Sequence, residues 1–405
     1  MFNKLIGAGF LVLFLAVNSA WAEGFLLKSQ RDSLAEKGLS FDLHSIADHV
    51  SVLNGGSVHR SSWVGRFDFV VDVDTEKAGL YKGGTLHIDV MNAGGGGLKP
   101  TGEMVGDLQG VNNIEAPKST RLFEAWYEQS LLDGKLSAKA GLHDVNSEFA
   151  ASENGALYLN GALGIMSSIS GNTGVSLFPL TALGTRVKYT PNENFDFLAG
   201  VYDGDPGDAD INKHNTHIAV KSQDGVFSIA EGQYHYKMPF AGGLPGTVKL
   251  GGWHNSQDVQ DVAALDDNGD PIIHDDNYGG YAILDQQIFR EMDDQGLSVF
   301  VMGGAAPQDR DTVQRSVAAG LNYTGLIPSR DKDVMGVAFT NASLSNKLRS
   351  STGQARGETA VEWTYKVQVN DSIVVQPDFQ YVVKPGGDDA IKNASVLTLR
   401  TDIHF

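Results

Sequence analysis

The feature that most constrains this chain is the alternation of apolar and polar residues in short stretches. The clearest stretch covers residues 63–74. Its apolar face carries Gly65, Phe67, Phe69, Val71 and Val73, and its polar face carries Arg66, Asp68, Asp72 and Asp74. A period of two is typical of a β-strand with one apolar and one polar face. The pattern recurs at 85–91, 358–368 and 397–405, and more weakly at 136–142, 185–189, 195–202, 227–236, 248–253, 297–302, 317–323 and 373–383.

In total, about 16 or 17 such stretches of about 9–13 residues follow one another, close to the strand length of an outer-membrane barrel. Turn-forming residues join several of them, at 133–134, 191–194, 224–225 and 370–371. Other connections are long and polar or rich in glycine, at 93–119, 145–180, 203–215 and 257–277. Short turns at one end and long loops at the other predict a transmembrane antiparallel β-barrel. The alternative is a secreted, soluble β-sandwich or β-helix, either an enzyme or a lectin. The aromatic C-terminal residue, Phe405, favours the barrel.

Composition agrees with a barrel and excludes several other classes. The 31 basic and 49 acidic residues give a net charge of −18, which argues against binding to nucleic acid or to an anionic membrane surface. The absence of cysteine excludes disulfide scaffolds, zinc–thiolate sites and cysteine nucleophiles. A hydrophobic content of 41% is low for a soluble β-sandwich of this length, but it suits a barrel with a polar interior.

The N-terminus has the pattern of an export signal. Lys4 precedes an apolar run at 5–17, and Ala20-Trp21-Ala22 forms a cleavage site, so we expect a signal peptide at 1–22 and one barrel domain at 23–405. A single membrane anchor would need about 20 apolar residues. No later apolar run approaches that length, which excludes a helical membrane protein. The predicted location is the outer membrane, reached through the periplasm.

No motif indicates a catalytic group, a cofactor or a metal. The acidic loop 203–210 carries Asp203, Asp205, Asp208 and Asp210, which could hold calcium, but a solvated acidic loop is favoured. The 11 histidines contain no metal-binding pair at helical spacing, and no nucleophile elbow is present. We therefore do not expect an enzyme. A barrel lipase or protease would need Ser/His or Asp/His groups gathered on one wall.

Several short motifs resemble those of a known family. The strongest lie at 106–110 (Gly-Asp-Leu-Gln-Gly), 113–116 (Asn-Ile-Glu-Ala) and 121–129 (Arg-Leu-Phe-Glu-Ala-Trp-Tyr-Glu-Gln). Others lie at 63–68, 77–80, 141–149, 179–184, 200–206, 306–310, 324–328 and 376–381. Together they resemble the carbohydrate-selective outer-membrane porins of the OprB family. The resemblance implies a 16-stranded barrel, a short periplasmic helix within 26–37 and passive diffusion of small sugars such as glucose. One alternating stretch would then be a loop, either 41–53 or the one near His217.

The candidate pore-lining residues follow from the polar faces of the strands. Arg66, Asp68, His87 and Asp89 lie on such faces. Glu124, Trp126 and Glu128 share one face of their strand, whereas strict alternation puts Arg121, a further candidate, on the other face. Asp144 and Glu148 begin a long loop that we expect to fold inward.

A sugar needs polar groups for its hydroxyls and an aromatic ring for its apolar face, so charged side chains and Trp126 are the expected contacts. The alternative places Trp126 with Trp63, Trp253 and Trp363 in an aromatic girdle. The net charge predicts that residual ion flow favours cations.

The sequence also leaves two alternative functions open and predicts several partners. The alternatives are a general, non-selective porin, or a structural or adhesive barrel plugged by 145–180, where 161–174 is poor in charge. The expected partners are small carbohydrates, outer-membrane lipid, the barrel-assembly machinery at Phe405 and further copies in a homotrimer, but no nucleic acid.

Overall fold

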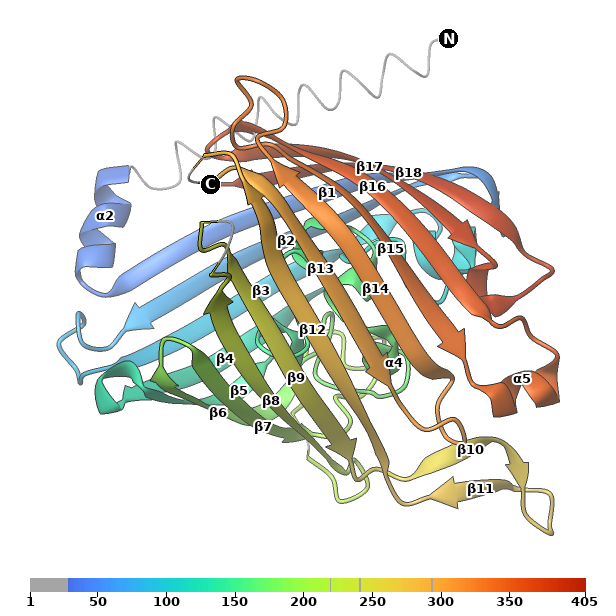
Figure 1. The fold of residues 1–405 in the computed structure, drawn as a ribbon. Coiled ribbons are helices and arrows are strands. Elements are labelled where there is room, and N and C mark those ends of the chain that lie inside the picture. Colours follow the sequence, from blue (N-terminus) through green and yellow to red (C-terminus); the bar gives the residue numbers. More distant parts are fainter. Residues whose placement is uncertain (1–27, 219, 240–241, 293) are drawn as a thin grey trace.

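The computed structural model describes residues 28–405 except 219, 240–241 and 293. The predicted signal peptide, 1–22, lies outside the described residues and remains a prediction. Within them, 16 strands close into one antiparallel barrel, β1–β9 and β12–β18, while β10 and β11 form a separate hairpin (Figure 1). This confirms the predicted barrel and excludes a soluble β-sandwich. No helix of the described residues has both the length and the apolar character needed to cross a membrane.

The barrel strands are 8 to 18 residues long. Their bounds are β1 Leu39–Gly56, β2 Ser61–Asp74, β3 Gly84–Gly96, β4 Ser119–Leu131, β5 Leu136–His143, β6 Ala182–Asn192, β7 Phe195–Asp203, β8 Val226–Lys237, β9 Pro245–Asn255, β12 Asn277–Arg290, β13 Gly296–Ala305, β14 Val313–Thr324, β15 Val334–Leu344, β16 Gly357–Asn370, β17 Ile373–Val383 and β18 Lys392–His404. The hairpin strands are β10 Val259–Leu265 and β11 Pro271–His274, and the helices are α2 Lys28–Glu36, α3 Gly161–Gly164, α4 Ser167–Ser170 and α5 Asn346–Thr352.

The barrel closes where its first strand meets its last. β1 pairs with β2 on one side and with β18 on the other. The stretch 41–53 is therefore a barrel strand, which excludes the first of the two alternatives for the extra loop. The described residues near His217 are not in a strand, so this alternating stretch is the one that belongs to a loop. α2 falls inside the predicted helix 26–37, whose first two residues lie outside the described part.

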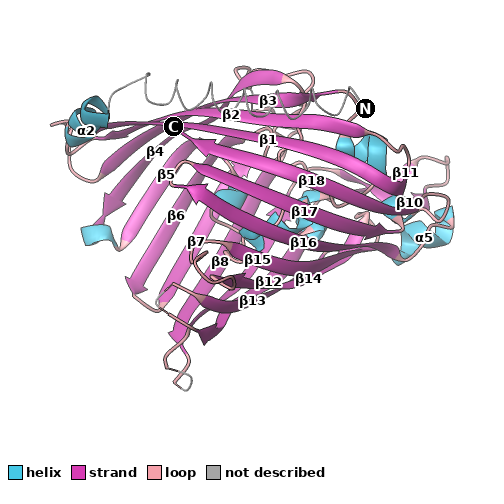
Figure 2. Ribbon diagram, turned by 90° about the horizontal axis from the view of Figure 1, so that it is seen from above, coloured by secondary structure: helices cyan, strands magenta, loops and turns pink. Residues whose placement is uncertain are grey.

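The two ends of the barrel differ as predicted. The end that holds α2 and Phe405, here called the α2 end, has the short turns, such as 132–135 and 193–194. The opposite end, here called the loop end, carries the β10–β11 hairpin and α5 (Figure 2). All four predicted long connections lie at the loop end. The turn predicted at 224–225 also lies there, at the close of the long connection before β8, so it is not one of the short hairpins.

Side chains alternate between the two faces of the wall. In β2, Phe67 is 40% exposed on the outside, whereas Asp68 is 3% exposed on the inside. The alternative that places all four tryptophans in an aromatic girdle is wrong. Trp63 and Trp363 are exposed on the outer face, but Trp253 is buried in the apolar core and Trp126 stacks on His87 on the inner face.

Two connections fold into the barrel, and we call them by their residues, loop 97–118 and loop 144–181. Loop 144–181 contributes Phe149, Tyr158, Leu163, Met166 and Ile169 to a large apolar cluster. The wall contributes the inner side chains of β7–β9 and β12–β15, including Tyr202, Phe227, Trp253, Tyr281, Ile283 and Phe300. The charge-poor segment 161–174 thus packs inside the barrel. A smaller cluster joins Met104, Val105 and Val111 of loop 97–118 to β1, β2 and β16–β18.

The many glycines make room for large inner aromatic side chains. A Cβ at Gly251 would lie 2.2 Å from Tyr281, one at Gly184 would lie 2.2 Å from Tyr202, and one at Gly320 would lie 2.5 Å from Phe300. In each pair the ring lies over the glycine of a neighbouring strand. The 48 glycines of the chain therefore serve the packing inside the wall as well as its turns.

Candidate functional site: the polar inner wall

The candidate site is a strip of charged side chains on the inner face of β2–β6. We call it the polar wall, and its members are Arg66, Asp68, His87, Asp89, Glu124, Trp126, Glu128, Lys139 and Arg186. The register brings them together, because Asp89 lies opposite Glu124, His87 opposite Trp126, and Lys139 opposite both Glu128 and Arg186. Seven of the predicted site residues thus share one continuous surface.

Arg66 is the cation that β2 contributes to this wall. Its Nε donates to Asp68 at 2.8 Å, and its Nη2 lies 3.9 Å from Asp89. The guanidinium carbon lies 5.1 Å from the ring centre of Phe123 and 5.2 Å from that of Phe178, which belongs to loop 144–181. Arg66 is therefore fixed by two carboxylates and two rings, with its side chain 21% exposed toward the interior.

Trp126 lies between the side chains of His87 and Lys139. The His87 ring stacks on the indole at 4.5 Å with an interplanar angle of 11°, and the Lys139 Nζ lies 4.2 Å from the ring centre. His87 is on β3 and Lys139 on β5, so the two side chains approach from opposite sides of β4. The indole Nε1 donates to Glu124 at 3.2 Å. Both faces of the indole are covered, which leaves its edge for other contacts.

A four-residue ion network occupies the next part of the wall. The Arg186 Nη2 donates to Glu128 at 3.1 Å, and its Nε lies 2.6 Å from Glu148. The Lys139 Nζ lies 2.5 Å from the same Glu148. Burial alone would raise the pKa of Glu148, but its bonds to Arg186 and Lys139 outweigh burial and hold that pKa below its usual range. Lys139 and Arg186 were missed from the sequence, although both lie in stretches whose alternation is visible.

A β-bulge changes the position of Arg121. The register with β3 shifts between Asp89 and Val90, so Arg121, Phe123 and Glu124 all have inward side chains. Strict alternation, which put Arg121 on the opposite face, was therefore wrong. Arg121 is 1% exposed, and it donates to the carbonyl oxygens of Pro117 and Pro179, in the two inward loops. In this position it holds the two loops to the wall.

Asp144 begins loop 144–181 and caps its first turn. Its carboxylate accepts from the backbone N–H of Asn146 at 2.7 Å and of Phe178 at 3.2 Å, while its own N–H donates to Glu124 at 2.8 Å. Burial raises the pKa of Asp144 to about 7. The loop therefore enters and leaves the interior against the polar wall.

Buried carboxylates on the remaining wall hold the loops, and the sequence analysis did not single them out. Glu231 accepts from the Ala150 N–H at 2.9 Å, Asp285 from the Ser152 hydroxyl at 2.6 Å, and Glu362 from the N–H groups of Leu159 and Asn160. Glu358 accepts from the N–H groups of Leu108 and Gln109 in loop 97–118. Burial raises the pKa of Asp107 well above its usual range, and the Glu358 carboxylate raises it further. The sequence signal for these anchors was an acidic residue on the polar face of a strand. Its hydrogen-bond partner, however, comes from the folded loop and cannot be seen in the sequence.

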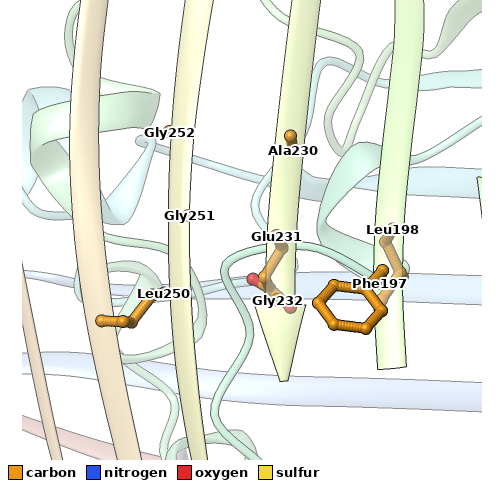
Figure 3. Close-up of a pocket in the computed structure, with 8 residues that line it drawn as sticks. All are labelled: Phe197, Leu198, Ala230, Glu231, Gly232, Leu250, Gly251 and Gly252. Carbon is orange, nitrogen blue, oxygen red and sulfur yellow. The ribbon is translucent and has the colours of Figure 1, made fainter. Parts of the chain in front are cut away.

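Two other features lie apart from this wall. A hollow lined by Phe197, Leu198, Ala230, Glu231, Gly232, Leu250, Gly251 and Gly252 opens on the outer surface (Figure 3). Phe197 and Leu250 are among the exposed residues that flank it. Ala230, Gly232 and Gly252, which have small side chains or none, leave the space between them open. In the acidic loop 203–210, Asp205 and Asp208 accept from the backbone N–H groups of Gly207 and Asp210. Its carboxylates do not form a three-ligand group within the described residues.

A closed barrel of 16 antiparallel strands, with an apolar outer face, a charged inner wall and an inward loop, defines an outer-membrane porin. The family model of the carbohydrate-selective porins, OprB family, matches residues 59–405, so the chain belongs to this family. It is 24% identical to Porin B of Pseudomonas aeruginosa, covering 96% of this chain and 92% of that protein. It is 23% identical to the putative porin QuiX of Acinetobacter baylyi, covering 93% and 91%.

Solved structures agree on the fold. The high-pH structure of Pseudomonas putida OprB matches with a TM-score of 0.83 at 22% identity, covering 93% of this chain and 96% of that one. A mutant of the Rh. blastica porin matches with a TM-score of 0.52 at 13% identity, covering 91% of this chain and 100% of that one. By its family, the protein is a sugar porin of the outer membrane and a transport channel.

Proposed function

We propose that small neutral sugars such as glucose diffuse passively along the polar wall, between that wall and loop 144–181. The observation that carries this proposal is the unequal covering of the interior. Loop 144–181 is tied to β8, β12 and β16 through Glu231, Asp285 and Glu362, whereas the polar wall keeps three partly exposed charged groups, those of Arg66, Glu124 and Glu128. The passage therefore follows the side of the barrel where polar groups still face the interior.

The paired charges suit a weak, repeated interaction with hydroxyl groups. Charge-assisted hydrogen bonds are stronger than neutral ones, and the ion pairs hold each group in place without a change of position on binding. Arg66, Glu124 and Glu128 supply donors and acceptors along the wall. Trp126 contributes its edge, because His87 and Lys139 already cover its faces. Binding has to remain weak, since a tightly held sugar would not leave the channel.

The test is single-channel conductance of the folded protein in a planar bilayer, with graded glucose and a non-sugar osmolyte of matched size. Saturable block by glucose alone supports the proposal. Open current without saturable block indicates a general porin, and no current from folded protein indicates a plugged barrel. Arg66→Gln and Glu128→Gln should weaken the block. Arg290→Gln is the matched control, because Arg290 is an exposed cation at the α2 end of β12 whose guanidinium donates to Gln287.

We also propose three partners that the sequence predicts: outer-membrane lipid, the barrel-assembly machinery and further copies of this chain. The exposed apolar side chains of the outer wall, such as Phe67, Val187 and Leu250, suit contact with lipid. Phe405 ends the closing strand, where assembly machinery would bind. A homotrimer would bury part of the outer face, and cross-linking in the outer membrane would reveal it.

A further inference from the structure

Two histidines and an aspartate come together where the barrel closes. His44 on β1 lies directly opposite His404 on β18, and their rings stack at 4.1 Å with an interplanar angle of 13°. The Oδ1 of Asp402 lies 2.6 Å from the His44 Nε2 and 3.5 Å from the His404 Nε2. In the part of the chain that the structure describes, this is the one group that brings three such ligand atoms within 4.8 Å of one another.

The group lies at the α2 end and faces the interior. His44 shares its face of β1 with Asp48 and Val50, which are buried inside the barrel. The side chains of His44 and Asp402 are 22% and 19% exposed, and that of His404 is 51% exposed. An ion can therefore reach all three residues.

A second carboxylate lies behind the group. The Asp68 Oδ2 is 3.9 Å from the Nδ1 of His44, and Asp68 is itself held by Arg66. In metal sites, a ligating histidine commonly has a carboxylate near its other ring nitrogen, which fixes the ring and raises its basicity. This position of Asp68 distinguishes the group from an ordinary His–Asp pair.

We propose that this group binds a divalent transition-metal ion of the Zn²⁺ class through the Nε2 of His44, the Nε2 of His404 and the Oδ1 of Asp402. Imidazole and carboxylate ligands suit Zn²⁺, Cu²⁺ and Ni²⁺ rather than the all-oxygen sites of Ca²⁺ and Mg²⁺. Tetrahedral bonds of about 2.0–2.2 Å put ligand atoms about 3.4 Å apart. The observed separations of 2.6 and 3.5 Å lie on either side of that value, so small rotations of the side chains suffice. Water takes the fourth position.

The ion would join the first strand of the barrel to the last. The adjacent C-terminal residue is already tied down, because Arg31 of α2 donates to the carbonyl oxygens of Phe405 and Phe41. A metal bridge between His44 and His404 adds a bond across the same seam. Binding of an ion to the folded state alone stabilises that state. The proposal therefore predicts both metal binding and a metal-dependent rise in the unfolding temperature.

The test is calorimetric titration of Zn²⁺ into the full chain, folded in detergent, stripped with chelator and free of any histidine tag. We expect one saturable site per chain and a higher unfolding temperature with Zn²⁺. His404→Gln and Asp402→Asn should each weaken binding by about 100-fold or more, since even partners behind the ligands contribute about 10–100-fold. His254→Gln is the matched control, because His254 is 50% exposed and, among the described residues, pairs with the single carboxylate of Asp276.

A measurement on the wild-type chain covers the case in which a β18 variant fails to fold. Co²⁺ bound by two imidazoles and a carboxylate in a tetrahedral site gives visible absorption, and Zn²⁺ should displace it at one equivalent. The proposal is overturned if the wild type shows no saturable Zn²⁺ site and no such Co²⁺ spectrum, or if folded His404→Gln binds Zn²⁺ as tightly as the wild type.

Discussion

The two halves of the barrel interior compared here are β2–β6 and the strands that pack under loop 144–181. They share the alternating strand pattern but differ in what covers their inward side chains. On β2–β6, inward positions carry paired charges, of which Arg66, Glu124 and Glu128 remain partly exposed. On β7–β9 and β12–β15, inward positions carry aromatic and aliphatic side chains that pack under loop 144–181, and the carboxylates there, Glu231 and Asp285, are buried and accept from backbone N–H groups of that loop. The comparison teaches that what covers an inward carboxylate decides whether it is a structural anchor or stays open to the interior, as the proposed pore groups do.

The largest expected effect tests the anchors of the covered half. Glu231→Ala leaves the Ala150 N–H, the Tyr281 hydroxyl and the Gln233 amide without their acceptor. Each buried donor left unpaired costs about 1–3 kcal/mol, so the unfolding midpoint of the detergent-folded barrel should fall markedly. Glu128→Ala, in the polar wall, is the comparison, and we expect it to destabilise less because Glu128 is partly exposed and pairs with Arg186 alone. Equal losses in the two variants would contradict the distinction between the halves.

A second prediction concerns the network at the border of the two halves. Arg186→Lys keeps the charge but cannot bond Glu128, Glu148 and Ser137 at once. Loss of a hydrogen bond to a charged group costs about 1.5–3 kcal/mol, and a looser start of loop 144–181 should increase the current noise of single channels. Lys188→Ala on the same strand, whose half-exposed side chain pairs with Asp196, should leave the noise unchanged. If Arg186→Lys channels had the current noise and the stability of the wild type, the bonds of the Arg186 guanidinium would not be what holds the loop.

The third prediction uses pH on the connection between β13 and β14. Burial raises the pKa of Asp311 to about 7, and its Oδ2 has no hydrogen-bond partner among the described residues. The folded state therefore keeps a proton that the unfolded chain loses near pH 4, so stability falls as pH rises from about 4 to 7. Asp311→Asn should not show this loss. The difference in unfolding free energy between the variant and the wild type should therefore favour the variant more at pH 8 than at pH 4, by about 1 kcal/mol or more.

Asp309 in the same connection provides a control of opposite sign. A hydrogen bond from Arg310 lowers the pKa of Asp309, so its stabilising contribution is present above about pH 4 and is lost as pH falls below that value. Asp309→Asn should therefore lose stability at pH 8. Thermal unfolding at several pH values measures both variants, and parallel pH profiles would refute the assignment for Asp311.

The smallest expected effect concerns Trp126. Because His87 and Lys139 cover both faces of its indole, Trp126→Phe should change the glucose concentration for half block by no more than about twofold. Planar-bilayer titration of the variant beside Glu128→Gln measures this. A loss of tenfold or more would restore the sequence-based hypothesis that sugar stacks on this ring.

The sequence predicted the polar wall better than the covered half, for a physical reason. Residues 63–74 and 85–91 alternate clearly because one face meets polar surroundings and the other does not. The strands β12 and β15 were not singled out, because their inner residues, such as Tyr281, Ile283 and Ala338, are themselves apolar under loop 144–181. Where a strand is buried on its inner face by a folded loop, the alternation on which the prediction depends is lost.

The sequence by itself determined the strand pattern, the porin family and the inward position of Arg66, Asp68, His87 and Asp89, since these depend on a period of two and on local motifs. The tertiary structure decided what distant segments supply: the bulge that turns Arg121 inward, the covering of Trp126, the loop partners of Glu231 and Glu362, and the meeting of His44 with His404. Spacing along the chain carries no trace of that last pair, because the closure of the barrel alone brings its first and last strands together.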